Sequence, residues 1–265
     1  MNIDVQNLSI ALPSGRKVVD SISFTLADGE RLGIVGESGS GKSVTTLAVM
    51  GLLPRALKAE GSILVGETQI VGAGQSTLRQ VRGSRVAMVF QDPSTALDPL
   101  MRIGRQLEEP LQRHQGLSGS TLRDGVLAAL AEVRLPDPER MIRSFPFEVS
   151  GGQRQRVAIA IALACQPQVL IADEPTTALD VTVQADILTL IRQLCQQRGM
   201  GLIFVSHDLA VVSQTVTRGL VMERGRIVEE GTIDQLIGAP TNPYTQKLVG
   251  SARALDEALI TGRLP

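Results

Sequence analysis

Short apolar segments separated by turn residues mark the beginning of the chain. Alternating apolar positions over residues 3–10 and 18–26, joined through Pro13-Ser14-Gly15, predict two antiparallel strands. An apolar run at residues 31–35 leads into a glycine-rich segment and then into a helical pattern over residues 42–53. The first part of the chain therefore predicts a small antiparallel sheet followed by a strand, a loop and a helix.

Further along, continuous apolar runs indicate buried parallel strands. These runs cover residues 85–90, 168–172 and 201–206. Between residues 91 and 150 the pattern is helical, most clearly over residues 102–115 and 121–133, and Pro136-Asp137-Pro138 breaks it. The alternation of strands and helices predicts an α/β fold with a helical insertion between two strands of one sheet.

The last third of the chain returns to short elements. Residues 154–164 predict a helix, and a short helix is expected after Leu209. Residues 219–223 and 226–230 predict a strand pair that turns at Arg224-Gly225, and terminal helices follow. This part of the chain is expected to complete the α/β core.

Composition excludes disorder and predicts an aliphatic core. Of the 265 residues, 43% are hydrophobic and only 2% are aromatic. The 26 basic and 27 acidic residues give a net charge of -1, which argues against a broad basic surface for binding nucleic acid. Cys165 and Cys195 are expected to be ordinary reduced thiols, because their spacing suggests neither a disulfide framework nor a metal site.

No segment of the sequence has the pattern of a membrane span or a signal peptide. The longest apolar run, residues 157–165, is far shorter than the ~20 residues that a membrane-spanning helix needs. The first ten residues carry neither a basic region nor a long apolar region. The chain is therefore expected to be soluble by itself, with any membrane role mediated by a partner.

The glycine-rich segment has the composition of a phosphate-binding loop. It matches the pattern GxxxxGK[ST] in full, with Gly36, Glu37, Ser38, Gly39, Ser40, Gly41, Lys42 and Ser43. Glycines let the backbone wrap with its N–H groups directed at phosphate oxygens, and the helix that starts there adds its positive end. Lys42 would reach the outer phosphates, and the Ser43 hydroxyl would bind Mg²⁺. The alternative, a chance match in a Gly/Ser loop, is disfavoured by the strand before it and the helix after it.

The apolar run that ends at Ala172 is followed by two carboxylates, Asp173 and Glu174. Because successive strand residues point to opposite faces, the two side chains are expected to have different roles. Asp173 suits a contact with Mg²⁺, whereas Glu174 could orient, or take a proton from, a water that attacks a γ-phosphate. Taken alone, two acids after a strand are more often a solvated strand end; the phosphate loop upstream favours the functional interpretation.

A second anion-receptive segment precedes the helix predicted at residues 154–164. It consists of Ser150, Gly151, Gly152 and Gln153. Serine and glycine at a helix start leave backbone N–H groups available to an anion. By itself this segment could equally be a plain N-cap.

Together these residues resemble the ATP-binding cassette (ABC) family of transport ATPases over nearly the whole chain. Its motifs occur in order as the Walker A loop at 36–43, the Q-loop Gln91, the signature at 150–153, Walker B ending in Asp173 and Glu174, the D-loop Ala178-Leu179-Asp180, and the switch His207. The resemblance implies a P-loop NTPase core with an N-terminal antiparallel β subdomain and an inserted α-helical subdomain. Within this single ABC ATPase domain, residues 1–90 and 151–240 would form the nucleotide-binding core, 92–150 the helical subdomain and 241–265 a C-terminal extension.

The resemblance also implies the roles of the motif residues and the cofactors, ATP and Mg²⁺. Two cassettes would pair head to tail, so that ATP on one Walker A loop is bound by the signature of the other. Glu174 and His207 would be catalytic, and Asp180 would belong to the D-loop. Gln91 would sense Mg²⁺, the attacking water and the transmembrane partner, and Mg²⁺ would be contacted by Ser43, Gln91 and Asp173. For a lone histidine such as His207, a core position is the structural alternative.

Longer strings are similar to the ATPases of oligopeptide, dipeptide and nickel importers. These strings are QDPSTALDPLMRIGRQLEEPL from Gln91, Phe145-Pro146-Phe147-Glu148, ADEPTTALDVTVQADIL and Pro240-Thr241-Asn242-Pro243-Tyr244-Thr245. The similarity favours peptides as the transported substrate, with nickel as the alternative. It implies a peripheral location at the cytoplasmic face of the inner membrane. Structurally, Asn242-Pro243-Tyr244 could be simply a turn with an anchoring aromatic.

The same similarity implies the partners. They would be a second ABC ATPase subunit in a heterodimer, two transmembrane permease subunits that contact the face near Gln91 and residues 102–145, and indirectly an extracytoplasmic substrate-binding protein. Nucleic acid is not expected as a partner. A soluble cassette acting on DNA or ribosomes is the alternative from another class, but no coiled coil, zinc ligands, tandem cassette or basic face is visible in the sequence.

The sequence departs from the family pattern at three places. No aromatic residue precedes Phe24, so Arg16, Lys17 or Val18 would have to cover the adenine ring. Val149 stands where leucine usually begins the signature, a small apolar change that should not disable it. The sequence reaches Pro265 without the cysteine-rich segment of many peptide-importer ATPases, so a short form is expected.

Overall fold

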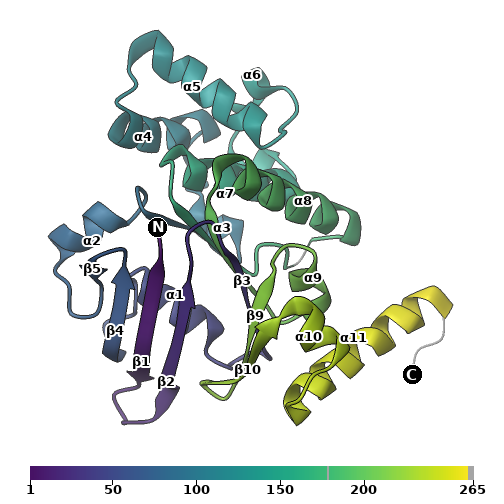
Figure 1. Ribbon diagram of the computed structural model, residues 1–265. Helices are drawn as coiled ribbons and strands as arrows, with labels where there is room; N and C mark the ends of the chain where they lie inside the picture. The colour runs from purple at the N-terminus through teal and green to yellow at the C-terminus, as the bar shows by residue number, and fades with distance from the viewer. Residues whose placement is uncertain (178, 262–265) are drawn as a thin grey trace. The chain divides into compact units, whose positions relative to one another are not determined.

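The computed structural model of the chain describes residues 1–177 and 179–261. Two residues named above, Ala178 of the D-loop and Pro265, lie outside the described residues. The chain divides into two compact units, one formed by Met1–Gly74 with Gly201–Pro265 and the other by Gln75–Met200. Figure 1 shows the elements of both units, coloured along the sequence.

The first unit contains an antiparallel sheet in the strand order β2-β1-β4-β5. Its strands are β1 (Ile3–Ala11), β2 (Lys17–Leu26), β4 (Lys58–Val65) and β5 (Thr68–Gln69). The predicted pairing of the first two strands is confirmed, with Ile3 opposite Leu26 and Val5 opposite Phe24. Buried side chains alternate with more exposed ones in β1 and β2, as expected for a sheet with one covered face. The alternation is interrupted once in each strand, at Gln6-Asn7 and at Asp20-Ser21, where the register shifts.

A second sheet in the same unit carries the phosphate-loop segment. The strands of this sheet that belong to the first unit are β3 (Arg31–Val35), β8 (Gly201–Ser206), β9 (Arg218–Glu223) and β10 (Arg226–Thr232). Strand β3 pairs in parallel with both β8 and β9, while β10 is antiparallel to β9. The apolar side chains of β3 and β8 are buried, which explains why their sequences read as continuous apolar runs rather than alternating ones.

Four helices within the described residues complete the first unit. They are α1 (Lys42–Val49), α9 (Leu209–Ser213), α10 (Ile233–Gly238) and α11 (Pro243–Thr261). The prediction that the first helix extends to residue 53 is wrong, because it ends at Val49 with Met50 as its C-cap. Gly51 adopts a left-handed backbone with φ 62°, which stops the helix, and Pro54 follows.

The second unit combines a parallel strand pair with helices. The strands are β6 (Val86–Val89) and β7 (Val169–Asp173). The helices are α2 (Gln75–Val81), α3 (Pro93–Ala96), α4 (Ile103–Gln115), α5 (Gly119–Glu132), α6 (Pro138–Met141), the 3₁₀ helix η1 (Pro146–Glu148), α7 (Gly151–Ala164) and α8 (Val181–Arg198). Helices α4 and α5 agree with the sequence to within two residues at each end, whereas α7 begins three residues before the predicted start at residue 154.

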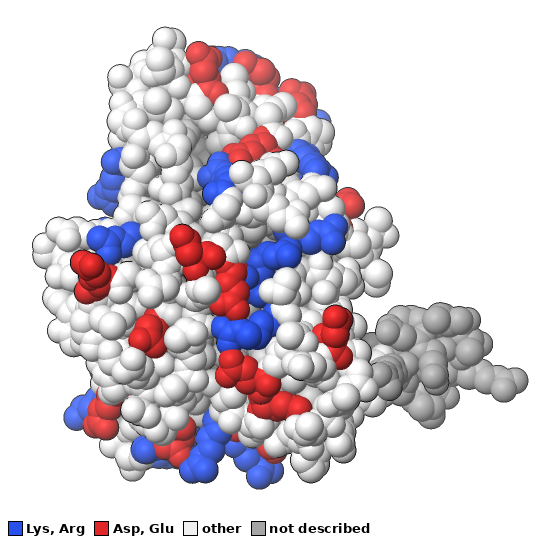
Figure 2. All heavy atoms as spheres, viewed as in Figure 1, with Lys and Arg blue, Asp and Glu red and all other residues white. Residues whose placement is uncertain are grey.

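Surface charge is mixed on the face drawn in Figure 2. Acidic and basic side chains are interspersed there, in keeping with the net charge of -1. Among the helices of the described residues, none is long and apolar enough to cross a membrane. Within the described residues neither Cys165 nor Cys195 forms a disulfide, and burial raises the pKa of the Cys165 thiol.

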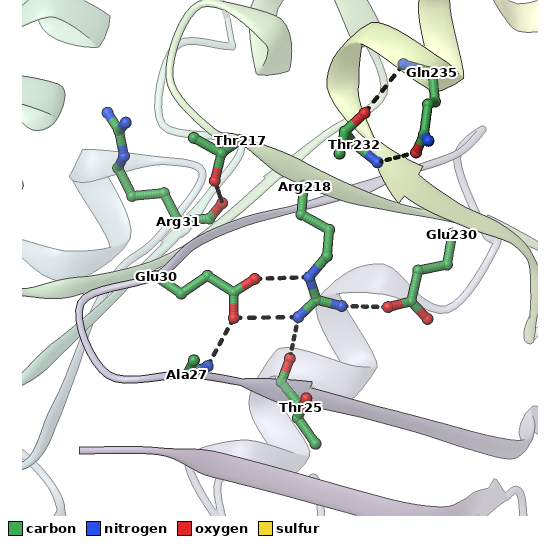
Figure 3. Close-up of polar contacts among 9 residues, drawn as sticks. All are labelled: Thr25, Ala27, Glu30, Arg31, Thr217, Arg218, Glu230, Thr232 and Gln235. Carbon is green, nitrogen blue, oxygen red and sulfur yellow. Dashed lines mark hydrogen bonds and ion pairs between the residues drawn. The ribbon is translucent and has the colours of Figure 1, made fainter. Parts of the chain in front are cut away.

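Arg218 links three segments of the first unit (Figure 3). From the start of β9 its guanidinium donates to Glu30 Oε1 at 2.6 Å and to Glu30 Oε2 at 3.2 Å. It also donates to Glu230 on β10 and to the backbone carbonyl of Thr25 at the end of β2. Burial tends to raise the pKa of Glu30, but the hydrogen bonds from Arg218 and the Ala27 amide hold it below its usual value. One side chain therefore ties the antiparallel sheet to the edge of the second sheet.

Replacing Arg218 with methionine is expected to destabilise the first unit. The half-buried carboxylate of Glu30 and the Thr25 carbonyl would lose their donor, which costs about 1–3 kcal/mol in the free energy of unfolding. Urea unfolding followed by circular dichroism measures this loss. Arg224→Met is the matched control, because that side chain is 92% exposed and pairs only at 3.9 Å with Glu223. Equal stabilities for the two variants would contradict the assigned role.

Glu229 on β10 holds the segment that enters α11. Its carboxylate accepts from the Thr241 amide at 2.7 Å, the Thr241 hydroxyl at 2.8 Å and the Asn242 amide at 3.1 Å. Burial tends to raise the pKa of Glu229, but these bonds lower it to about 2. The buried Thr245 hydroxyl acts in the same direction, although it lies outside hydrogen-bond geometry. The charged form of Glu229 is thus the one that fixes the start of α11.

Glu229 is expected to contribute to the acid sensitivity of the fold. Its folded-state pKa lies below the usual 4.5, so it stabilises the fold above that pH, and the contribution is lost as the pH falls toward 2. Glu229→Gln should therefore lower the melting temperature at pH 7, and its difference from the wild type should shrink between pH 5 and pH 3. Thermal scans across this range test the point, with the exposed Glu60→Gln as control. A pH-independent difference would refute the linkage.

Candidate functional site

The glycine-rich loop follows β3 directly and owes its shape to close backbone contacts. A Cβ atom on Gly36 would lie 2.2 Å from the Met222 carbonyl oxygen of β9, so no larger residue fits there. Gly41, with φ 103°, is the N-cap of α1, and a Cβ there would lie 3.0 Å from the Val18 carbonyl oxygen. The backbone therefore turns tightly between β3 and α1, as a phosphate-binding loop requires.

Lys42, the first residue of α1, is held inside this loop. Only 4% of the residue is exposed. Its ammonium group donates to the Gly36 carbonyl at 2.7 Å and to the Glu37 carbonyl at 3.0 Å. A buried ammonium group at the start of a helix makes the loop strongly receptive to an anion.

Ser40 supplies an observation that fits a phosphate ligand. Its hydroxyl oxygen is fully buried and, within the described residues, has no hydrogen-bond partner. The hydroxyl is turned into the loop, because a Cβ on Gly36 would lie 2.7 Å from it. Buried hydroxyls are normally paired, so this one fits a ligand that brings its own acceptor oxygen. Ser43 follows on the first turn of α1, where its hydroxyl offers a hard oxygen of the type that Mg²⁺ takes.

His207 belongs to the same unit, on the turn between β8 and α9. The residue is exposed, so the alternative of a core histidine is wrong. The turn is fixed by its neighbour Asp208, whose carboxylate accepts from the Ala210 amide at 2.8 Å and whose amide donates to Ser206 Oγ at 3.0 Å. The imidazole is thus presented at the surface from a rigid turn.

The other predicted residues lie in the second unit, where Glu174 is the centre of a small network. It follows the buried Asp173 at the end of β7 and adopts a left-handed backbone, φ 45°. Its Oε2 accepts from Gln91 Nε2 at 3.3 Å and from Thr177 Oγ1 at 3.0 Å. The structure therefore brings the Q-loop glutamine and the Walker B glutamate together, although 83 residues separate them in sequence.

A left-handed backbone at a glutamate is uncommon and carries a strain of order 1 kcal/mol. Here it turns the chain sharply as the strand ends, so that Asp173 and Glu174 cannot continue the alternation of a strand. Asp173 is only 6% exposed, whereas Glu174 is half-buried. The two carboxylates thus lie in different environments, and the different roles expected for them stay a prediction.

The signature segment forms the beginning of α7. Ser150 is the N-cap and makes a capping box with Gln153: Ser150 Oγ accepts from the Gln153 amide at 3.3 Å, and Gln153 Oε1 accepts from the Ser150 amide at 3.0 Å. Gly152 lies against α8, because a Cβ there would come within 2.6 Å of Val183 Cγ1. Asp180 caps α8 by accepting from the Val183 amide at 3.0 Å. The plain N-cap expected for Ser150 is present, and it leaves the two glycines at the helix start.

The segment predicted to cover adenine forms the turn into β2. Arg16 is exposed, and Lys17 pairs with Asp20 at 2.6 Å rather than covering an apolar surface. Phe24 is buried in the antiparallel sheet. The expectation that one of residues 16–18 stacks on the base stays a prediction.

Two residues of α11 contact the loop from its outer side, and neither contact was predicted from the sequence. The Tyr244 hydroxyl accepts a hydrogen bond from the Glu37 amide at 2.8 Å, and Lys247 Nζ lies 3.1 Å from Glu37 Oε1. The sequence indicates Tyr244 only as a possible anchoring aromatic in the turn Asn242-Pro243-Tyr244. It does not indicate that the phosphate loop is the segment that Tyr244 contacts.

Comparison with known proteins places the chain among transport ATPases. A family profile described as "ABC transporter" matches residues 19–177 of the chain. A putative peptide import ATP-binding protein of Brucella abortus is 47% identical over 99% of this chain and 80% of its own length. The dipeptide transport ATP-binding protein DppD of Haemophilus influenzae is 47% identical, over 94% of this chain and 77% of its own.

Solved structures show the same fold. The dimeric ATP-binding cassette MJ0796, in a post-hydrolysis state bound to ADP and Pi, has a TM-score of 0.77 at 28% identity, over 87% of this chain and 98% of that one. The cbiO1 protein of Clostridium perfringens, part of the ABC transporter complex cbiONQ, has a TM-score of 0.79 at 25% identity. The match covers 97% of this chain and 94% of that one. The expected fold class, a P-loop cassette with an antiparallel β subdomain and a helical insertion, is confirmed. The chain belongs to the ABC transporter family, as an ATP-hydrolysing cassette.

Proposed function

We propose that the chain is the ATP-hydrolysing subunit of an importer for peptides. Relatives that are 46–47% identical to it are described as peptide or dipeptide transport proteins. The strings after Gln91 and around Asn242-Pro243-Tyr244 point to the same group of importers. Nickel is the alternative substrate, and none of these relatives carries that description.

The observation that carries the proposal is the position of Glu174. Its carboxylate stands at the end of β7 and is oriented by donors from Gln91 and Thr177. A carboxylate held in this way can accept a proton from a water, or orient it, as the water attacks the γ-phosphate of ATP. The products are ADP and inorganic phosphate. His207 would assist from its turn after β8 by contacting the γ-phosphate.

The residues also fit Mg²⁺, which would neutralise charge on the transferring phosphate when bound. Hydroxyl, amide and carboxylate oxygens are the ligands that this ion prefers, and Ser43, Gln91 and Asp173 offer them. Asp173 is 6% exposed, so its carboxylate favours a cation close by. We assign these three residues to Mg²⁺ and residues 36–43 to the ATP phosphates, with Lys42 as the main source of positive charge.

A second cassette completes the proposed site. Ser150, Gly151, Gly152 and Gln153 would bind the ATP held by the partner cassette, and Asp180 would belong to the D-loop at that interface. The dimeric MJ0796 cassette offers a precedent for pairing. We propose a related but different chain as the partner, which gives a heterodimer.

The helical part of the second unit offers a surface for membrane subunits. A groove of about 690 Å³ is lined by α4, α5, the residues before α4 and the segment between α6 and η1, among them Leu100, Met101 and Phe145. Leu100 is 86% exposed, and Phe145 stacks on the exposed Phe147 with ring centres 5.5 Å apart. An exposed apolar surface of this kind is typical of an interaction site.

We propose that this groove receives an intracellular segment from each of two transmembrane permease subunits. The chain would then be a peripheral subunit at the cytoplasmic face of the inner membrane. An extracytoplasmic binding protein would deliver the peptide from the other side. Residues 92–150 would act as the helical subdomain of the single ABC ATPase domain, beside a core of residues 1–90 and 151–240 and an extension at 241–265.

Glu174→Gln is expected to lower ATP hydrolysis at least ~100-fold, because the amide cannot take up a proton. ATP binding should persist, so the variant should accumulate an ATP-bound dimer that light scattering detects. The purified chain is tested alone and mixed with its partner cassette.

Glu109→Gln is the matched control for this loss. It is another acid-to-amide change in the second unit, at a side chain that is 78% exposed. Hydrolysis by this variant should equal that of the wild type. If Glu174→Gln kept full activity, the catalytic assignment would be wrong.

Arg105→Glu is expected to impair transport far more than ATP binding. Arg105 lines the groove and is 71% exposed, so its reversal should spare the fold but repel the membrane subunits. In proteoliposomes of the complete complex, we expect the uptake of a labelled dipeptide to fall about tenfold. This corresponds to a loss of ~1.4 kcal/mol in the free energy of interaction with the membrane subunits.

Arg113→Glu provides the matched reversal on the same helix. Arg113 is 72% exposed, also pairs with a glutamate on α4 and does not line the groove. Dipeptide uptake by the Arg113→Glu complex should equal that of the wild type. Equal uptake by the two variants would argue against the groove as the docking site.

The same proteoliposomes distinguish the two substrates. The wild-type complex should not take up radiolabelled nickel, and nickel uptake would support the alternative substrate.

A further inference from the structure

A cavity of about 600 Å³ lies on the outer side of the phosphate loop. It is enclosed within the first unit by the loop, by the turn between β9 and β10 and by the start of α11. Tyr244 and Lys247 of α11 line it together with Glu37, which both of them contact. The loop is therefore contacted by a segment of the chain that follows it by about 200 residues.

The start of α11 is itself firmly held. Asn242 and Thr241 are bound by the Glu229 carboxylate of β10. Asn242 Oδ1 accepts from the Tyr244 amide at 2.8 Å, and Asn242 Nδ2 donates to the Val228 carbonyl at 3.4 Å. Tyr244 thus meets the loop from a fixed position rather than from a mobile end.

The contact orients one peptide group of the loop. The peptide between Gly36 and Glu37 is trans, so its carbonyl and its N–H point in opposite directions. The Glu37 N–H donates outward to the Tyr244 hydroxyl at 2.8 Å. The Gly36 carbonyl on the opposite side accepts from the Lys42 ammonium at 2.7 Å. Fixing the N–H from outside therefore fixes the carbonyl that holds the lysine inside.

We propose that Tyr244 is a positioning residue for ATP binding, which acts by holding the Gly36–Glu37 peptide in the orientation that keeps Lys42 inside the phosphate loop. The inference rests on the proposed function, since it assumes that the loop binds the phosphates of ATP. Without the hydroxyl, this peptide can rotate and the ammonium loses one of its carbonyl acceptors. The nucleotide must then restore the loop geometry when it binds, which weakens affinity without changing the chemical step.

The first test compares Tyr244→Phe with Lys247→Met in the full chain. The phenylalanine keeps the ring and removes only the acceptor oxygen. We expect the Kd for ATP, measured by calorimetry, and the KM to rise about three- to tenfold, while kcat changes less than twofold. Lys247→Met removes the other contact to Glu37, an exposed ion pair, and should leave Kd within about twofold. Both variants should melt close to the wild type.

The second test asks whether Tyr244 acts through the Glu37 amide. Glu37→Pro removes the N–H donor, whereas Glu37→Gln keeps it and removes only the carboxylate. Tyr244→Phe should raise Kd in the Glu37→Gln background and have no further effect in the Glu37→Pro background.

Two results would overturn the proposal. One is an unchanged Kd in Tyr244→Phe, which together with a lower melting temperature would make Tyr244 a structural anchor only. The other is an equal effect of Tyr244→Phe in both Glu37 backgrounds. If Glu37→Pro does not fold, the comparison of Tyr244→Phe with Lys247→Met still decides. A wild type that binds no ATP would reject the proposed function itself, and this inference with it.

Discussion

The close approach of backbone at Gly36 is the constraint on which the phosphate loop depends. A Cβ at this position would overlap the Met222 carbonyl oxygen at 2.2 Å. The approach exists because β3, which ends one residue earlier, pairs in parallel with β9. The loop must therefore leave the sheet across the neighbouring strand, and only glycine allows this.

Other contacts then set the loop from both sides. The Gly225 amide donates to the Ser40 carbonyl at 3.0 Å, and the start of α1 lies against the Val18 carbonyl of β2. On the inner side, Lys42 is held by two loop carbonyls. These contacts shape the loop before a ligand arrives, so that little conformational entropy remains to be lost on binding.

In the second unit, helix caps and one left-handed residue fix the positions of the motif residues. Helix caps at Ser150 and Asp180 fix where α7 and α8 begin, and each satisfies backbone N–H groups that a helix start leaves unpaired. The left-handed backbone of Glu174 ends β7 abruptly, and two donors then hold its carboxylate. Local capping and one strained residue are sufficient to present these groups.

The sequence predicted the elements best where burial is complete. Strands β3 and β8 were predicted residue for residue, because a strand covered on both faces reads as an unbroken apolar run. Strand β4 was missed because its first half is largely exposed and shows no apolar pattern. It also contains Gly61, where an added Cβ would lie only 2.4 Å from the Asn7 carbonyl oxygen. The end of α1 was missed because the apolar pattern continues through Leu52 while Gly51 stops the helix.

By itself, the sequence determined the phosphate loop, the order of the motifs and the family. These depend on residue types at fixed short spacings, which local stereochemistry makes recognisable. Only the tertiary structure decided that Tyr244 binds the Glu37 amide, 207 residues away, and that Arg218 pairs with Glu30 across 188 residues. Such contacts follow from which strands pair and which segments pack together, and no local pattern encodes them.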